Sequence, residues 1–88
     1  MIEHIRLSLR LSSEIFDCEI KALIDACIAD LKLSGIDTDK DHPDIQVLIR
    51  QAVTLYCKAH FGFADIAVKY VDIYEKLKVV LGIASKNV

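Results

Sequence analysis

The strongest constraint on the fold is the spacing of apolar residues between residues 16 and 34, which repeats with the period of an α-helix. The apolar positions fall at i, i+3, i+4, i+7, i+8 and i+11, so they share one face of a helix. They are Ile20, Leu23, Ile24, Cys27, Ile28 and Leu31. Gly35 follows as the expected C′ residue, because glycine adopts positive φ without steric cost, and Ile36 would then contact Leu31 in a Schellman motif.

Similar spacing recurs in two later segments. The first starts at Pro43, which suits the first helical position because its missing N–H is not needed there, and Gly62 is expected to end it. The second covers residues 66–81, with Asp65 as a possible cap and Gly82 as its expected end. The stripe of the first is Ile45, Leu48, Ile49, Ala52, Val53, Tyr56 and His60, and that of the second is Ile66, Tyr70, Ile73, Tyr74, Leu77 and Leu81.

The N-terminal residues permit two interpretations, because apolar and polar residues alternate there as in a strand. The apolar positions are Ile5, Leu7, Leu9 and Leu11. A lone strand has no partner inside an otherwise helical chain. We therefore predict a short helix from Ile2 to Leu9, with an edge strand that pairs with a neighbouring subunit as the alternative. The whole prediction is one domain over residues 1–88, an all-α bundle of about four helices, with residues 83–88 as a mobile tail.

Apolar residues make up 53% of this 88-residue chain, which is more than so small a core can bury. The surplus indicates that neighbouring subunits cover part of the surface. A net charge of −2 and the absence of a Lys or Arg run argue against tight binding to nucleic acid. Three scattered cysteines without a CxxC pair indicate free, buried thiols in a reducing compartment. We see no secretory signal and no apolar run that could cross a membrane, so we expect a cytosolic protein.

The loop between the first two long helices has the start of a calcium-binding pattern. Asp37, Asp39 and Asp41 occupy the first, third and fifth positions of an EF-hand loop. The sixth position, which requires glycine, is His42, and the twelfth, which requires a bidentate glutamate, is Leu48. These departures favour a solvated acidic loop.

Zinc binding and catalysis have little support in the sequence. Cys57 and His60 lie one helical turn apart, but zinc needs three or four ligands and nothing places His4 or His42 nearby. The chain has no GxSxG motif, no glycine-rich phosphate loop and no HExxH motif. We predict no metal site, no cofactor and no catalytic residue, and hence a protein that is not an enzyme.

A small helical DNA-binding or regulatory protein is the main alternative function. The helix lengths suit a helix-turn-helix protein, in which one helix enters the major groove. The helix that begins at Pro43 would present Asp44 near its N-terminus, where a carboxylate repels phosphate.

Several residues have the size or position expected at a subunit interface. Small residues form a second stripe on the first long helix, which lets another helix approach closely. Aromatic residues on both sides of Gly62 either fill the core at the turn or anchor a partner protein, and the last helix adds two tyrosines. The candidate interface residues are Ala22, Ala26, Ala29, Phe61, Phe63, Tyr70 and Tyr74.

The order of short strings along residues 5–81 resembles the phage head-tail connector family, also described as phage DNA-packaging proteins. The strings are Leu9-Arg-Leu11, Asp17-Cys-Glu19-Ile20, Leu23-Ile24-Asp25-Ala26, Ala29-Asp30-Leu31, Gly35-Ile36, Asp44-Ile45, Ile49, Ala52-Val53 and Leu55-Tyr56-Cys57-Lys58-Ala59-His60-Phe61-Gly62. None of them is a catalytic signature, and most of these residues pack helices together.

The resemblance implies a structural virion protein at the head-tail junction, made in the cytoplasm of the bacterial host. Such subunits form a homo-oligomeric ring under the portal, extend the DNA channel and support the stopper or tail-completion proteins. Double-stranded DNA would pass through the ring as cargo, and no membrane, cofactor or enzymatic step is expected.

Overall fold

The structure is a computed structural model, and it describes residues 2–10, 14–60 and 64–86. Its elements are α1 (Ile2–Ser8), the 3-10 helix η1 (Glu14–Phe16), α2 (Asp17–Leu33), α3 (Pro43–His60) and α4 (Ala64–Lys86). These described residues contain no strand. The predicted all-α bundle of about four helices is therefore confirmed.

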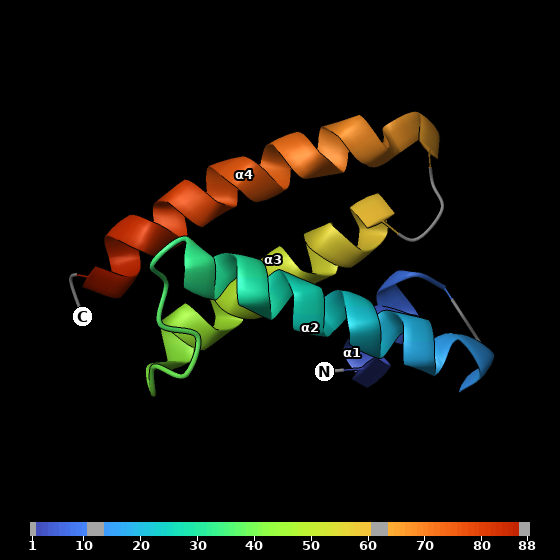
Figure 1. Cartoon of the computed structure of the whole chain (residues 1–88), viewed down its shortest axis with the longest axis horizontal. Coiled ribbons are helices and arrows are strands. Elements are labelled where there is room, and N and C mark those ends of the chain that lie inside the picture. Colours follow the sequence, from blue (N-terminus) through green and yellow to red (C-terminus); the bar gives the residue numbers. More distant parts are fainter. Residues whose placement is uncertain (1, 11–13, 61–63, 87–88) are drawn as a thin grey trace.

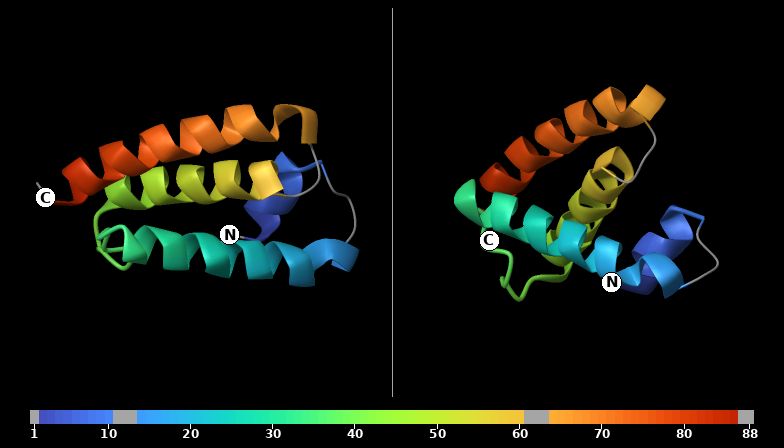
Figure 2. Two further views of the ribbon diagram at one scale, coloured as in Figure 1. Left: turned by 45° about the horizontal axis from the view of Figure 1, so that its top comes forward. Right: turned by 45° about the vertical axis from the view of Figure 1, so that its right-hand side comes forward.

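α3 is the central helix of the bundle. It packs against both α2 and α4 (Figure 1), and the left view of Figure 2 shows it between them, while the right view shows α2 and α4 converging toward their C-terminal ends. Every fourth or third residue of α3 is apolar and buried, which explains why this segment occupies the centre. The core that these helices enclose includes Ile20, Cys27, Leu31, Ile45, Ile49, Val53, Cys57, Tyr74 and Leu81.

The N-terminal segment forms α1, so the predicted short helix is confirmed and the edge strand is not. Ile5 and Leu9, one helical turn apart, are buried, whereas Leu7 is exposed. The Arg6 guanidinium joins α1 to the start of α2, because Nε and Nη2 donate to the two carboxylate oxygens of Asp17 at 3.1 and 2.6 Å. α1 also packs against α3 and so closes that end of the core.

The C-terminus of α2 has the Schellman motif predicted from Gly35 and Ile36. Gly35 has φ of 87°, and its N–H donates to the carbonyl of Lys32 at 3.0 Å. The N–H of Ile36 donates to the carbonyl of Leu31 at 3.1 Å, and both side chains are buried. A local glycine signal and a hydrophobic contact therefore end the helix together.

α4 differs from its predicted bounds at both ends. It begins at Ala64, so Asp65 lies within the helix, and it continues through Gly82 to Lys86. The prediction that Gly82 ends the helix is wrong. A glycine inside a helix costs about 1 kcal/mol relative to alanine, and the burial of Leu81 and Ser85 on the inner face offsets that cost. Gly62, the expected end of α3, lies outside the described residues.

The last turn of α4 is held by the loop that connects α2 to α3. Lys40 Nζ donates to the carbonyl of Ser85 at 2.7 Å, where the unpaired carbonyls of a helix C-terminus accept a cation favourably. Of the residues predicted as a mobile tail, 83–86 are thus helical, and 87 and 88 lie outside the described residues.

Candidate interaction surface

The small residues of α2 lie on its exposed side. Cys18, Ala22, Ala26 and Ala29 are all exposed, and they are spaced by three or four residues, so they share one face. Leu33 continues that face at the C-terminal end and is 89% exposed. We call these five residues the α2 outer face. It is turned away from the buried residues of α2 that meet α3.

α4 carries a second exposed apolar surface near its C-terminus. Val79, Val80 and Ile83 lie within about one helical turn of each other, and Val79 and Ile83 are 64% and 61% exposed. We call these three residues the α4 patch. Each is a large β-branched side chain that the described part of the subunit leaves in contact with solvent.

The aromatic candidates have different environments. Tyr70 is half-buried, and Lys58 Nζ lies 5.7 Å from the centre of its ring. Tyr74 is only 3% exposed, so it lies in the core of the subunit and not on its surface. Phe61 and Phe63 lie outside the described residues.

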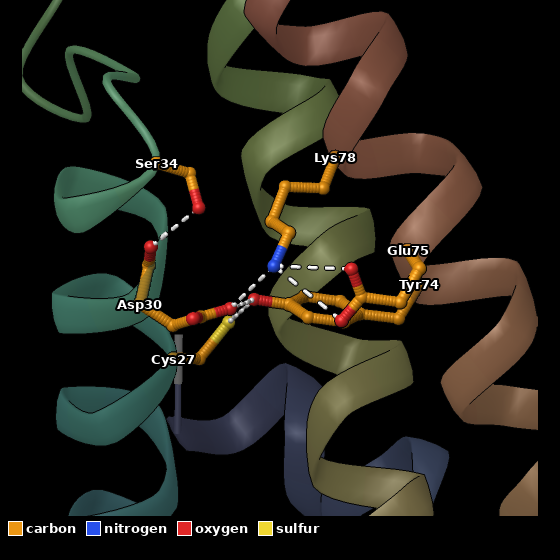
Figure 3. A network of polar contacts seen from close by, with 6 residues as sticks. All are labelled: Cys27, Asp30, Ser34, Tyr74, Glu75 and Lys78. Atoms are coloured by element: carbon orange, nitrogen blue, oxygen red, sulfur yellow. Dashed lines mark hydrogen bonds and ion pairs between the residues drawn. The ribbon is translucent and has the colours of Figure 1, made fainter.

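Tyr74 is the centre of a polar network that joins α4 to α2 (Figure 3). Its hydroxyl donates to Asp30 Oδ2 at 2.6 Å and accepts from the Cys27 thiol at 3.6 Å. Lys78 Nζ donates to the same Asp30 oxygen at 3.1 Å and also pairs with Glu75. The ring of Tyr56, from α3, meets the ring of Tyr74 edge-on at 5.4 Å between centroids. Local sequence patterns do not reveal this network, because its α2 members lie more than forty residues from its α4 members.

The network shifts the pKa values of its members in ways that favour its present protonation states. The hydrogen bond from Tyr74 lowers the pKa of Asp30, and Lys78 lowers it further although burial opposes them. Burial and the hydrogen bond to Asp30 raise the pKa of Tyr74 above its usual range. Burial alone would lower the pKa of Lys78, but its hydrogen bonds to Asp30 and Glu75 raise it overall. The arrangement is a carboxylate that accepts from a neutral phenol and from an ammonium group, which suits a structural bridge.

Two of the three cysteines match the prediction of buried thiols, and one does not. Cys27 and Cys57 are fully buried, and burial raises their pKa values to about 11 and about 12. Cys18 is exposed because its position on α2 faces away from the core, so the prediction is wrong for this residue.

The two possible metal sites do not assemble. Cys57 points into the core, whereas His60 is exposed and its ring lies 4.3 Å from that of Tyr56. In the acidic loop, the backbone N–H of Asp39 donates to Asp37, and Gln46 holds the loop through the carbonyls of Thr38 and Lys40. Within the described ranges no three His, Cys, Asp or Glu side chains gather as a metal site would need.

The proposed DNA-recognition helix, α3, is the most covered helix of the bundle. Its first turn exposes Pro43 and Asp44, and most of its length packs against α2 and α4. A recognition helix must present a free face to the major groove, which this packing restricts. Among the residues that the structure describes, no helix has both the length and the apolar character needed to cross a membrane.

Comparison with known families gives one finding. A family model described as phage connector protein matches residues 1–88, which is the full length of the sequence. No curated protein and no solved structure matches the chain.

Proposed function

Because the chain belongs to the phage connector protein family, we propose that it forms a homo-oligomeric ring at the head-tail junction of a tailed-phage virion. In this role the ring binds the portal protein on one side and a stopper or tail-completion protein on the other. It extends the channel through which double-stranded DNA passes. The protein is made in the host cytoplasm and acts without a catalytic step.

The observation that carries this proposal is the pair of exposed apolar surfaces on separate helices. The α2 outer face and the α4 patch lie on helices that pack on α3 from different sides (Figure 2). A ring subunit must contact one neighbour on each side, and so needs two surfaces. Exposed apolar groups of this kind mark protein interfaces. The face made of Ala22, Ala26 and Ala29 and the last helix are thus the proposed sites of ring contact.

The charge of the chain fits DNA as a passing cargo. Its net charge is −2, so it lacks the basic excess with which proteins neutralise phosphates. A channel that bound DNA tightly would obstruct its passage. The polar network around Tyr74 also supports a structural role. Its side chains form hydrogen bonds with one another across the bundle.

The direct test is to tag the protein, induce its phage or prophage, and identify the proteins that purify with it by mass spectrometry. The proposal predicts recovery of the portal protein together with stopper or tail-completion proteins. Recovery of host regulators or DNA without any virion protein would contradict it and support the DNA-binding alternative. In that alternative, binding to DNA would weaken steeply as the salt concentration rises.

A further inference from the structure

We propose that the loop between α2 and α3, residues 34–42, is a strap that holds the last turn of α4 in the helix, so that loop and turn open as one unit. The loop passes beside the C-terminal end of α4 (Figure 1). Three residues form the relay between them: Gln46 on α3, Lys40 in the loop and Ser85 on α4. A change at Gln46 should therefore reach the end of α4, although both hydrogen bonds of its side-chain amide go to the loop.

The contact on α4 satisfies a group that the helix leaves open. The carbonyl of Ser85 is among the last four of α4, and such carbonyls have no partner within their own helix. Lys40 Nζ donates to it at 2.7 Å, and a cation at this end of a helix also interacts favourably with the helix dipole. Lys40 stands between Asp39 and Asp41 in the sequence, yet its ammonium group lies at α4. The loop thus stabilises the last helical turn for as long as it keeps its position.

Gln46 fixes the position of the loop. Its side-chain Nε2 donates to the carbonyls of Thr38 and Lys40 at 3.1 and 2.8 Å, so one amide holds the loop backbone at two points. The carbonyl of Lys40 also accepts from the backbone N–H of His42 at 2.9 Å. These bonds set where the Lys40 side chain begins, and so whether its ammonium group reaches Ser85.

Two features make the closed position of the strap costly. Thr38 Oγ1 and His42 Nδ1 are buried, and neither has a hydrogen-bond partner among the residues that the structure describes. Unpaired buried polar atoms lower stability, and both atoms would meet water if the loop lifted. Gly82 precedes the last turn of α4, where glycine is unfavourable and where an added Cβ atom would meet nothing within 4 Å. The strap is therefore poised to open locally while the core stays folded.

The device couples the surface of the loop to the end of α4. Displacement of the loop would release residues 83–86 from the helix, and withdrawal of those residues would free the loop. Coupling between two places in one molecule is reciprocal, so each movement favours the other by the same amount.

Hydrogen exchange of the full chain, followed by mass spectrometry, tests this coupling. Gln46→Ala removes the clamp on the loop, and Lys40→Met removes the ammonium group but keeps most of the aliphatic stem. Gln51→Ala is the matched control, at an exposed position of the same helix as Gln46. We expect both strap variants to raise the exchange rates of the loop and of residues 83–86 by at least ~threefold, with the middle of α3 unchanged. Gly82→Ala should slow exchange in residues 83–86 by about threefold.

An effect of Gln46→Ala that is confined to the loop would overturn the coupling. An equal rise of exchange in all helices would also overturn it, because the substitution would then act on the whole fold. So would a rise in residues 83–86 after Gln51→Ala that matches the rise after Gln46→Ala. These results do not depend on assembly, so failure of the strap would leave the proposed function unaffected.

Discussion

The hydroxyl of Tyr74 donates a 2.6 Å hydrogen bond to Oδ2 of Asp30, and this contact ties the last helix to α2 across the central helix. The same carboxylate oxygen accepts from Lys78, so one acidic residue of α2 holds two residues of α4 (Figure 3). If the outer surfaces of α2 and α4 both contact neighbouring subunits, this bridge fixes the angle between the two contacts. It would then help to set the geometry with which a ring closes.

Tyr74→Phe removes the hydroxyl and leaves the ring. We expect the free energy of unfolding to fall by about 1–2 kcal/mol, because a hydrogen bond to a charged acceptor is lost while Asp30 keeps Lys78 and partial access to water. Urea denaturation measures the change. Tyr70→Phe is the control, since the ring near Lys58 is retained, and we expect a change within about 0.5 kcal/mol. Equal effects of the two substitutions would contradict the bridge.

Acid should weaken this bridge. The pKa of Asp30 is lowered in the folded state, so its contribution to stability is present above the ordinary carboxyl pKa and is lost as pH falls through the folded value. We expect the melting temperatures of the wild type and Asp30→Asn to differ at neutral pH and to converge as the pH is lowered from the ordinary carboxyl pKa of about 4 through the lower folded value. Thermal melts across this range give the comparison. A constant difference down to pH 2 would mean that Asp30 stabilises the fold by something other than its charge.

Only one of the three thiols should react in the folded protein. Cys18 is exposed, whereas Cys27 and Cys57 are buried with pKa values raised to about 11 and about 12. Titration with a chromogenic disulfide at pH 8 should therefore give one fast equivalent in the native state and three in denaturant. Cys18→Ala should remove the fast equivalent. Rapid reaction of all three native thiols would show that the core around Tyr74 opens easily.

The parts of the fold that sequence predicts best are those set by local signals. Gly35 and Ile36 end α2 as expected, because the left-handed turn and the contact with Leu31 involve adjacent residues. Gly82 carries the same local signal but does not end α4, because buried Leu81 and the hydrogen bond from Lys40 to Ser85 come from tertiary packing.

The candidate surface also has features that local spacing predicts and features that depend on tertiary packing. The helical spacing of Ala22, Ala26 and Ala29 placed them on one face, and the structure leaves that face exposed. Tyr74 fits an apolar stripe equally well as a core residue or as an interface residue, so the stripe could not reveal its bond to Asp30. That contact depends on how two distant helices pack on a third, which no local pattern encodes.

Ala26→Glu should separate folding from assembly. The side chain at this position is exposed in the subunit, so we expect circular dichroism and the melting temperature to change little. In the proposed ring the glutamate would be buried without a partner, and we expect recovery with portal-containing particles to fall by at least ~tenfold. Gln51→Glu adds the same charge at an exposed position of α3 and should be recovered normally. Normal recovery of Ala26→Glu would remove the α2 outer face from the interface.

Electron microscopy of particles made without this protein tests the head-tail connector role most directly. The gene is deleted from the phage, and lysates are compared with and without wild-type protein supplied from a plasmid. We expect the deletion to yield heads and tails that are not joined, and the supplied protein to restore tailed, infectious particles. Tailed and infectious particles in the absence of the protein would contradict the connector role.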